Sequence, residues 1–232
     1  MDSVIIANNI SKIYQNGEQP FYALKDVSIS IPKGKLVILK GPSGSGKTTL
    51  LNILSSLDVP SEGEVIWDGV KLSDVGESEH EYLRRMKIGF VFQSVALIPI
   101  MNAYENVEFA LRLTDKKKID DARIKEVLKF VGMEERMMHM PGQMSGGEQQ
   151  RIAIARAIVN HPMVLFADEP TAALDTKNGL SVIKLFKELV RSENTTVVMT
   201  THDPNLMEMA DELYELKDGE IIASRKDGPD HE

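Results

Sequence analysis

Cysteine is absent from the 232-residue sequence, and so is any long apolar run. The chain therefore has no disulfide, no thiolate metal ligand and no thiol nucleophile, and its composition suits a reducing compartment. No segment approaches the roughly 18 consecutive apolar residues of a membrane-spanning helix, and the opening MDSVIIANNISK lacks a basic leader. We expect a cytoplasmic chain that reaches a membrane only by binding another protein.

Positive charge is also scarce, with 27 Lys and Arg against 35 Asp and Glu. The formal charge of -8 offers no general attraction to phosphate backbones, so no nucleic acid partner is expected. The apolar fraction of 42% is sufficient to bury a substantial core in a chain of this length. Composition thus predicts a globular protein of one large domain or two small ones.

Apolar runs alternate with segments of helical periodicity, which is typical of an α/β fold around a mostly parallel sheet. The strand-like runs are residues 36–39, 88–92, 164–167 and 196–200. Runs at residues 4–7, 24–31 and 64–67 lie beside turn-forming residues and indicate hairpins. We interpret these hairpins as a small antiparallel subdomain.

Between residues 94 and 160 the strand signals give way to helical periodicity, most clearly in residues 119–131 and 149–158. We expect a helical subdomain at 94–160, inserted into a core formed by residues 1–93 and 161–232 of a single domain. Lys116 to Lys118 are expected to form a solvated loop, and the tail at 226–232 is expected to fray.

The segment Gly41-Pro42-Ser43-Gly44-Ser45-Gly46-Lys47-Thr48 fits the pattern of a phosphate-binding loop. It follows a predicted strand and precedes a helical segment at residues 49–57, which is the required context. Its glycines allow backbone N–H groups to face phosphate oxygens, Lys47 can reach the β and γ phosphates, and the Thr48 hydroxyl can ligate Mg²⁺. The alternative is a flexible turn, and the flanking strand and helix favour a nucleotide site.

Two adjacent carboxylates, Asp168 and Glu169, end the apolar run at residues 164–167. At a strand end, Asp168 can hold the Mg²⁺ shell, whereas Glu169 can polarise the water that attacks a γ-phosphate. Without the phosphate-binding loop, two solvated acids would be the favoured interpretation. With that loop in the same chain, the pair predicts ATP hydrolysis.

Residues 144–151, with the sequence MSGGEQQR, resemble the signature of ATP-binding cassette (ABC) proteins and lie upstream of Asp168 and Glu169. Other segments match the same family: Gln93 after an apolar run, Ala173-Leu174-Asp175 after Glu169, and His202 after residues 196–201. The resemblance covers essentially the whole chain. It implies a P-loop NTPase core with a RecA-like, mostly parallel sheet, an antiparallel β subdomain and an inserted α-helical subdomain.

The resemblance also implies roles for individual residues. Gln93 would sense Mg²⁺ and the attacking water, His202 would hold the γ-phosphate, and Tyr14 would stack on adenine, although Phe21 and Tyr22 are nearby aromatics. The implied catalytic set is Glu169, His202, Gln93 and Lys47. The implied ATP ligands are Tyr14, Gly41, Pro42, Ser43, Gly44, Ser45, Gly46, Lys47, Thr48 and Thr49, and the implied metal ligands are Thr48, Gln93 and Asp168.

A second copy of the chain is the first expected partner. Residues 145–147 open a predicted helix whose N-terminus can hold phosphate, and the resemblance implies that it acts on the ATP of the other copy. Two-fold symmetry then creates two equivalent sites. The residues implied to act on the partner's ATP are Ser145, Gly146, Gly147, Glu148 and Asp175.

The signature differs from the usual one by carrying Met144 for Leu and Glu148 for Gln. Glu148 adds a negative charge near ATP, and we hypothesise that this charge weakens ATP-driven closure. Ser145 and Glu148 also fit a capping box, in which Glu148 turns back to the Ser145 N–H. We favour the capping box.

Segments at residues 50–54, 89–93 and 149–157 resemble one ABC branch, the lipoprotein-release and macrolide-export type, although Ala172-Ala173 replaces its usual Gly-Asn. This implies an outward-moving or force-transmitting permease with a large extracytoplasmic domain, and a chain peripheral on the cytoplasmic face of the membrane. The expected docking groove spans residues 94–104. Its apolar side chains, which fill the helical core in the alternative, are Leu97, Ile98, Met101 and Tyr104.

Non-transport ABC ATPases are the alternative class. DNA-repair members insert long coiled coils, and no segment here sustains several heptads. Translation-linked members usually carry two cassettes, and this length holds one.

Overall fold

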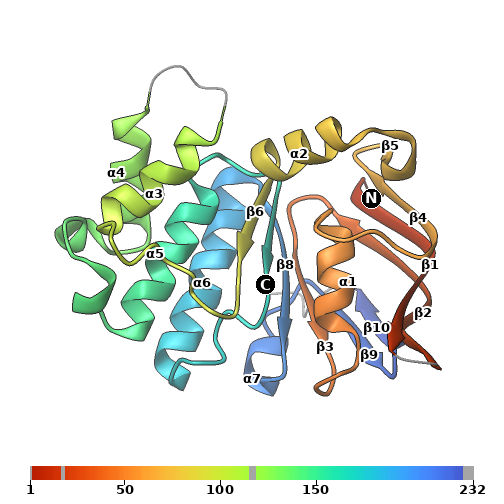
Figure 1. Ribbon diagram of the computed structural model, residues 1–232. Helices are drawn as coiled ribbons and strands as arrows, with labels where there is room; N and C mark the ends of the chain where they lie inside the picture. The colour runs from red at the N-terminus through yellow and green to blue at the C-terminus, as the bar shows by residue number, and fades with distance from the viewer. Residues whose placement is uncertain (1, 17–18, 115–118, 227–232) are drawn as a thin grey trace.

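The computed structural model describes residues 2–16, 19–114 and 119–226, which form two β-sheets with helices between and beside them (Figure 1). The loop expected at Lys116 to Lys118 and the tail beyond Lys226 lie outside the described residues. Within the described part of the chain, no helix is both long enough and apolar enough to cross a membrane.

The larger sheet has six strands in the order β10-β9-β3-β8-β7-β6. Strands β9, β3, β8, β7 and β6 are mutually parallel, and only β10 runs antiparallel to its neighbour. The predicted strands are confirmed here as β3 (Leu36–Lys40), β6 (Ile88–Val91), β7 (Val164–Ala167) and β8 (Thr196–Thr201), to which β9 (Glu212–Lys217) and β10 (Glu220–Lys226) are added.

The smaller sheet is antiparallel, in the order β2-β1-β4-β5. Its strands are β1 (Ser3–Asn16), β2 (Gln19–Pro32), β4 (Glu62–Trp67) and β5 (Val70–Lys71). The first two strands are far longer than the predicted runs, because their register shifts interrupt the apolar alternation that marks a strand in sequence.

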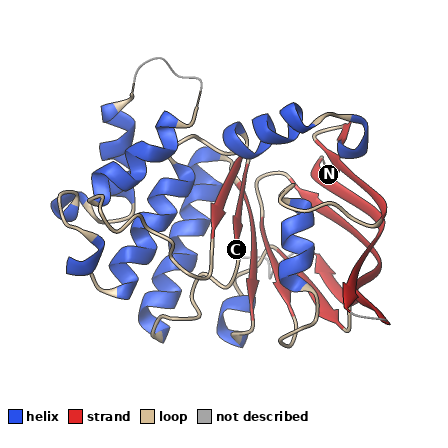
Figure 2. Ribbon diagram, in the orientation of Figure 1, coloured by secondary structure: helices blue, strands red, loops and turns tan. Residues whose placement is uncertain are grey.

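Helices cluster at the end of the molecule remote from the antiparallel sheet, where α3, α4 and α5 pack together (Figures 1 and 2). The α-helices are α1 (Lys47–Leu54), α2 (Glu77–Met86), α3 (Ala103–Arg112), α4 (Asp121–Phe130), α5 (Gly146–Ile158), α6 (Thr176–Glu193) and α7 (Pro204–Met207). Short 3-10 helices are η1 (Leu72–Asp74), η2 (Glu134–Arg136) and η3 (Pro141–Gln143).

Two apolar cores hold these layers together. In one core, helices α3, α4, α5 and α6 pack against one face of the larger sheet. In the other core, α1 and the antiparallel sheet pack against the opposite face. The buried indole of Trp67 donates to Leu54 O at 2.7 Å, which ties β4 to the last turn of α1. Because α1 is held between the two sheets, the loop that enters it lies at a fixed position beside the carboxyl ends of β3, β7 and β8.

Candidate functional site

The loop of residues 41–48 connects β3 to α1 in a conformation that requires glycine. Gly41 has φ 151° and Gly46 has φ 100°, and a Cβ at these positions would lie 2.2 Å from Leu216 O and 2.6 Å from Ala23 O. Lys47 is 6% exposed, and its ammonium donates to Gly41 O at 2.8 Å and to Pro42 O at 2.9 Å. A buried cation is thus held inside a ring of backbone, an arrangement that suits phosphate.

One cavity of about 330 Å³ at the start of α1 is lined by eight predicted site residues. Four of them, Lys47, Thr48, Gln93 and Glu169, have predicted metal-binding or catalytic roles and come from three separate segments of the chain. The remaining lining residues are Phe21, Ala23, Ser43, Gly44, Gly46 and Thr49.

Asp168 lies directly after β7, beside Thr48. The Thr48 hydroxyl is 3.2 and 3.0 Å from the two carboxylate oxygens of Asp168. A hydroxyl, a carboxylate and the nearby Gln93 amide form a set of hard oxygen donors, which is the chemistry that Mg²⁺ prefers. The residues present therefore fit the expected ion.

Glu169 adopts the left-handed backbone region, with φ 42°. One of its carboxylate oxygens is 3.7 Å from His202 Nδ1. The two side chains also line a second cavity of about 320 Å³, which contains Asp175. Asp175 caps α6 by accepting from Asn178 N at 2.9 Å. Glu169 thus borders both cavities, whereas His202 and Asp175 line only the second.

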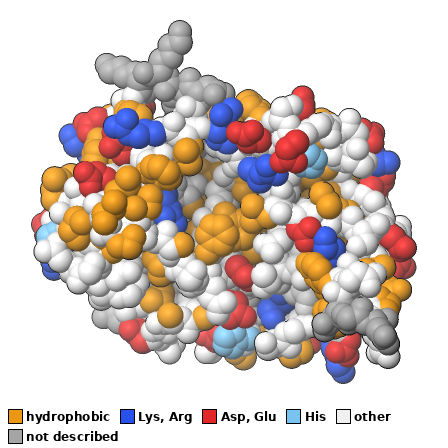
Figure 3. Space-filling model, in the orientation of Figure 1, with side chains coloured by type: hydrophobic (Ala, Val, Ile, Leu, Met, Phe, Trp, Pro, Cys, Tyr) orange, Lys and Arg blue, Asp and Glu red, His pale blue; other side chains and the backbone are white. Residues whose placement is uncertain are grey.

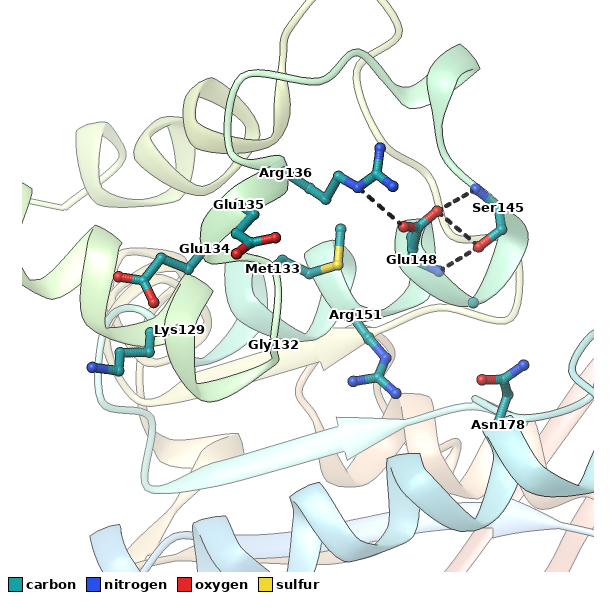
Figure 4. Close-up of a pocket in the computed structure, with 11 residues that line it drawn as sticks. Lys129, Gly132, Met133, Glu134, Glu135, Arg136, Ser145, Glu148, Arg151 and Asn178 are labelled. Carbon is teal, nitrogen blue, oxygen red and sulfur yellow. Dashed lines mark hydrogen bonds and ion pairs between the residues drawn. The ribbon is translucent and has the colours of Figure 1, made fainter.

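The signature residues lie elsewhere. Ser145, Gly147 and Glu148 line a third cavity of about 580 Å³ with Arg136, Arg151 and residues around the end of α4 (Figure 4). No residue of the loop 41–48 lines it. Within one chain, the structure therefore separates the signature from the loop cavity.

The capping box at the start of α5 is present. Glu148 Oε2 accepts from Ser145 N at 2.8 Å and from Ser145 Oγ at 3.0 Å, while Glu148 N donates to Ser145 Oγ at 3.3 Å (Figure 4). These bonds lower the pKa of the Glu148 carboxyl. The hydrogen bond from the Ser145 backbone N–H has the largest effect, and the bond from the Ser145 hydroxyl comes second. Glu148 Oε1 also lies 3.7 Å from Arg136 Nε.

Tyr14 and Phe21 are cross-strand neighbours near the ends of β1 and β2. The Tyr14 hydroxyl donates to Asp58 at 3.0 Å, and the Lys12 ammonium lies 5.2 Å from its ring centre. Burial of the Tyr14 hydroxyl raises its pKa, and the hydrogen bond to Asp58 raises it further. Phe21 lines the loop cavity, whereas Tyr14 is not among its lining residues. Pairing across two long strands brings Phe21 there, which single-residue patterns do not reveal.

Thr200 is a residue that the sequence did not single out. It is fully buried in β8, where its hydroxyl contacts Asp168 and the backbone of Glu169. The apolar character of its strand hid it, because a threonine in a buried strand resembles ordinary packing.

The predicted docking residues divide between groove and core. Ile98 lines an apolar groove of about 670 Å³ with Phe90, Phe92, Phe109 and Leu113. Leu97 and Tyr104 are partly buried and pack against the core of the helical region, as in the alternative interpretation, so their predicted part in docking stays a prediction. Helix α3 begins after the Asn102 cap, and its residues Phe109 and Ala110 line the groove.

Comparisons with known proteins agree with this architecture. The family model for ABC transporters matches residues 24–172. An ABC transporter ATP-binding protein of Methanocaldococcus jannaschii, MJ0796, is 45% identical, covering 96% of this chain and 97% of the relative. Another, YknY of Bacillus subtilis, is 41% identical, covering 94% of this chain and 95% of the relative.

Solved structures match equally far along the chain. A dimeric structure of MJ0796 has a TM-score of 0.89 at 45% identity, covering 96% of this chain and 98% of that chain. A dimeric post-hydrolysis state of MJ0796 bound to ADP and Pi also has a TM-score of 0.89, at 44% identity with the same coverage. CbiO1 of Clostridium perfringens, part of the CbiONQ transporter complex, has a TM-score of 0.85 at 27% identity, covering 99% of this chain and 90% of that chain. This chain belongs to the ABC transporter ATP-binding family.

Proposed function

We propose that two copies of this chain close around two ATP molecules and hydrolyse them to drive a separate membrane permease. The observation that carries the proposal is the convergence of Lys47, Thr48, Gln93 and Glu169 on one cavity at the start of α1. A buried ammonium, a hydroxyl, an amide and a carboxylate supply the groups that phosphoryl transfer to water requires.

Each side chain has a role that follows from its position. Lys47 neutralises charge on the β and γ phosphates, and the N–H groups at the start of α1 bind their oxygens. Glu169 accepts the proton of the attacking water, with Gln93 orienting that water. His202, close to Glu169, contacts the γ-phosphate.

Thr48, Gln93 and Asp168 are the proposed holders of Mg²⁺. The ion, when bound, neutralises charge that develops on the phosphate oxygens. The short distances from the Thr48 hydroxyl to both Asp168 oxygens support this assignment.

The separation of the signature from the loop cavity supports a shared site. Ser145 and Gly147 open α5, whose N-terminus attracts anions, yet they line a different cavity from Lys47. A second copy related by two-fold symmetry can bring its signature to this chain's ATP and receive the reciprocal contact. The dimeric MJ0796 structures support this arrangement. Loss of the γ-phosphate would then release the two halves.

The groove between α2, α3 and β6 is the proposed permease site. Hydrophobic side chains extend over this face in Figure 3, and Phe92, Phe109 and Leu113 remain partly exposed there. An apolar groove of this kind receives one face of an amphipathic helix. Together with the branch-like segments 50–54 and 149–157, it supports an exporter or mechanotransmission permease with a large extracytoplasmic domain, and a peripheral location on the cytoplasmic membrane face.

The groove is tested by Phe109→Glu, with Ile222→Glu on the exposed face of β10 as the matched control. We expect the first variant to lose sedimentation with membranes of its native cells while keeping wild-type ATP hydrolysis. Equal membrane recovery of both variants would exclude this groove as the docking site.

Hydrolysis is tested by Glu169→Gln, with the exposed Glu188→Gln on α6 as the control. Loss of the general base should lower the turnover number by about 100-fold or more, because general-base catalysis contributes on the order of 10² to 10⁴. Phosphate release under saturating MgATP measures it. Wild-type turnover in Glu169→Gln would remove Glu169 as the base.

A further inference from the structure

Thr200 lies at the point where the two catalytic carboxylates leave β7. It is the penultimate residue of β8, which pairs in parallel with β7 and β3. Its side chain is 0% exposed, so its hydroxyl has no access to bulk water. Any hydrogen bonds that it forms must be made within the protein.

The hydroxyl makes two such bonds, one to each carboxylate residue. It donates to Asp168 Oδ1 at 2.7 Å and accepts from the backbone N–H of Glu169 at 2.8 Å. A hydroxyl has a single proton, so the proton is committed to Asp168 and the oxygen lone pair to Glu169. One buried oxygen therefore links the side chain of Asp168 to the main chain of Glu169.

This link acts where the backbone is strained. Glu169 has φ 42°, a left-handed conformation that a non-glycine residue adopts only when its surroundings impose it. The turn directs the Glu169 side chain toward the loop cavity and His202, while Asp168 remains beside Thr48. Two residues adjacent in sequence thus take different orientations, and Thr200 is bonded to both.

We propose that Thr200 is a positioning residue that sets the orientation of the Asp168 carboxylate and the backbone of Glu169 through a single buried hydroxyl. The inference rests on the proposed hydrolytic function of this site. Thr200 acts through the Asp168 carboxylate and the Glu169 backbone and is not itself proposed to contact the nucleotide. Its loss should therefore alter the metal-dependent part of nucleotide binding and the turnover number, and leave metal-free nucleotide binding unchanged.

The test compares Thr200→Val, which keeps the side-chain volume, with Thr200→Ser, which keeps the hydroxyl. Loss of a group that orients metal ligands typically costs about 10- to 100-fold in affinity or activity. We expect Thr200→Val to lower kcat by about 10-fold or more, with a smaller change in KM, and Thr200→Ser to restore most of it. If Thr200→Val does not fold, Thr200→Ala and Thr200→Ser provide the same comparison.

A readout independent of turnover is the rise in thermal midpoint on adding ADP, measured with Mg²⁺ and again with EDTA. We expect Thr200→Val to reduce the Mg²⁺-dependent increment and to leave the rise in EDTA as in wild type. Thr196→Val is the matched control, because Thr196 is a buried threonine of the same strand that bonds Gly34 N and Pro32 O. A purely structural role for Thr200 predicts equal effects of the two valine variants.

The outcomes separate this inference from the proposed function. Absence of ATP hydrolysis by the wild-type chain would overturn both. Wild-type hydrolysis, together with a wild-type kcat and Mg²⁺ increment in Thr200→Val, would overturn only the role of Thr200. A Thr200→Ser variant as impaired as Thr200→Val would also overturn it, because the hydroxyl would then not be the active group.

Discussion

Glu148 is bound at the start of α5 by the backbone and the hydroxyl of Ser145. The sequence was compatible with an added charge facing ATP or with a capping box, and the capping box is present. Its second oxygen has Arg136 as a positive neighbour. The negative charge is therefore used locally, to hold the first turn of the helix that carries the signature.

The cap makes stability depend on pH. The pKa of Glu148 is lowered from its usual 4.5, chiefly by the Ser145 N–H. A carboxylate with a lowered folded-state pKa contributes stability above its unfolded pKa, and this is lost as pH falls through the folded pKa. We expect the stability advantage of wild type over Glu148→Gln to shrink between about pH 5 and about pH 3, measured by urea unfolding.

Glu135→Gln serves as the control for that measurement, since Glu135 lies in η2 of the same region and caps no α-helix. A difference between wild type and Glu148→Gln that does not change with pH would contradict the cap. The hypothesis that the charge weakens closure predicts that Glu148→Gln forms dimers at lower ATP concentration.

For single residues, sequence spacing predicted those site residues whose neighbours in the site are also their neighbours in the sequence. The loop 41–48 and the pair Asp168-Glu169 each lie within one short segment, so their geometry follows from a few neighbouring residues. Thr200 could not be predicted in this way, and the sequence did not decide among Tyr14, Phe21 and Tyr22 as the aromatic beside the loop. Thr200 meets Asp168 across 32 positions of the chain, through strand register that no local pattern encodes.

Helix α5 is held at its far end by a buried arginine. Arg123 of α4 is 4% exposed, and its guanidinium donates to Val159 O at 3.3 Å and Ile158 O at 3.0 Å. It also pairs with Glu193, at the end of α6, at 2.9 Å. One side chain thus satisfies the terminal carbonyls of α5 and ties three helices together.

We predict that Arg123→Met lowers the free energy of unfolding by about 3 kcal/mol, because it leaves buried carbonyls and a carboxylate without their donor. Urea denaturation measures the change. Arg112→Met is the control, since Arg112 is exposed and pairs with Glu108 one turn away, which should cost no more than about 0.5 kcal/mol. An equal loss of unfolding free energy in both variants would contradict a larger stabilising contribution from the buried Arg123.

Strands β3, β7 and β8 of the larger sheet were predictable because both of their faces are buried, which leaves a largely unbroken apolar run, whereas the more exposed β9 and β10 were not predicted. Helix α2 was not predicted, and the reason is physical. None of its residues is fully buried, and only Tyr82, Leu83 and Met86 are apolar or aromatic, which leaves too few apolar positions for a helical period to be recognised. The division of the domain into a core of residues 1–93 and 161–232 and a helical subdomain at 94–160 stays a prediction.

The whole molecule presents half of each proposed ATP site. The loop cavity and the signature cavity are lined by different residues, and in the proposed dimer the second copy brings its signature to this chain's loop. The groove that we propose as the permease site is lined by a third set of residues. On this proposal, closure of the dimer moves the groove without the permease touching nucleotide.

The most direct test of this account is the mass of Glu169→Gln in solution, measured by light scattering with saturating MgATP and again with MgADP. Because the variant retains the γ-phosphate that both halves would hold, we predict the mass of a dimer with ATP and of a monomer with ADP. The same mass with both nucleotides would contradict a site shared between two copies.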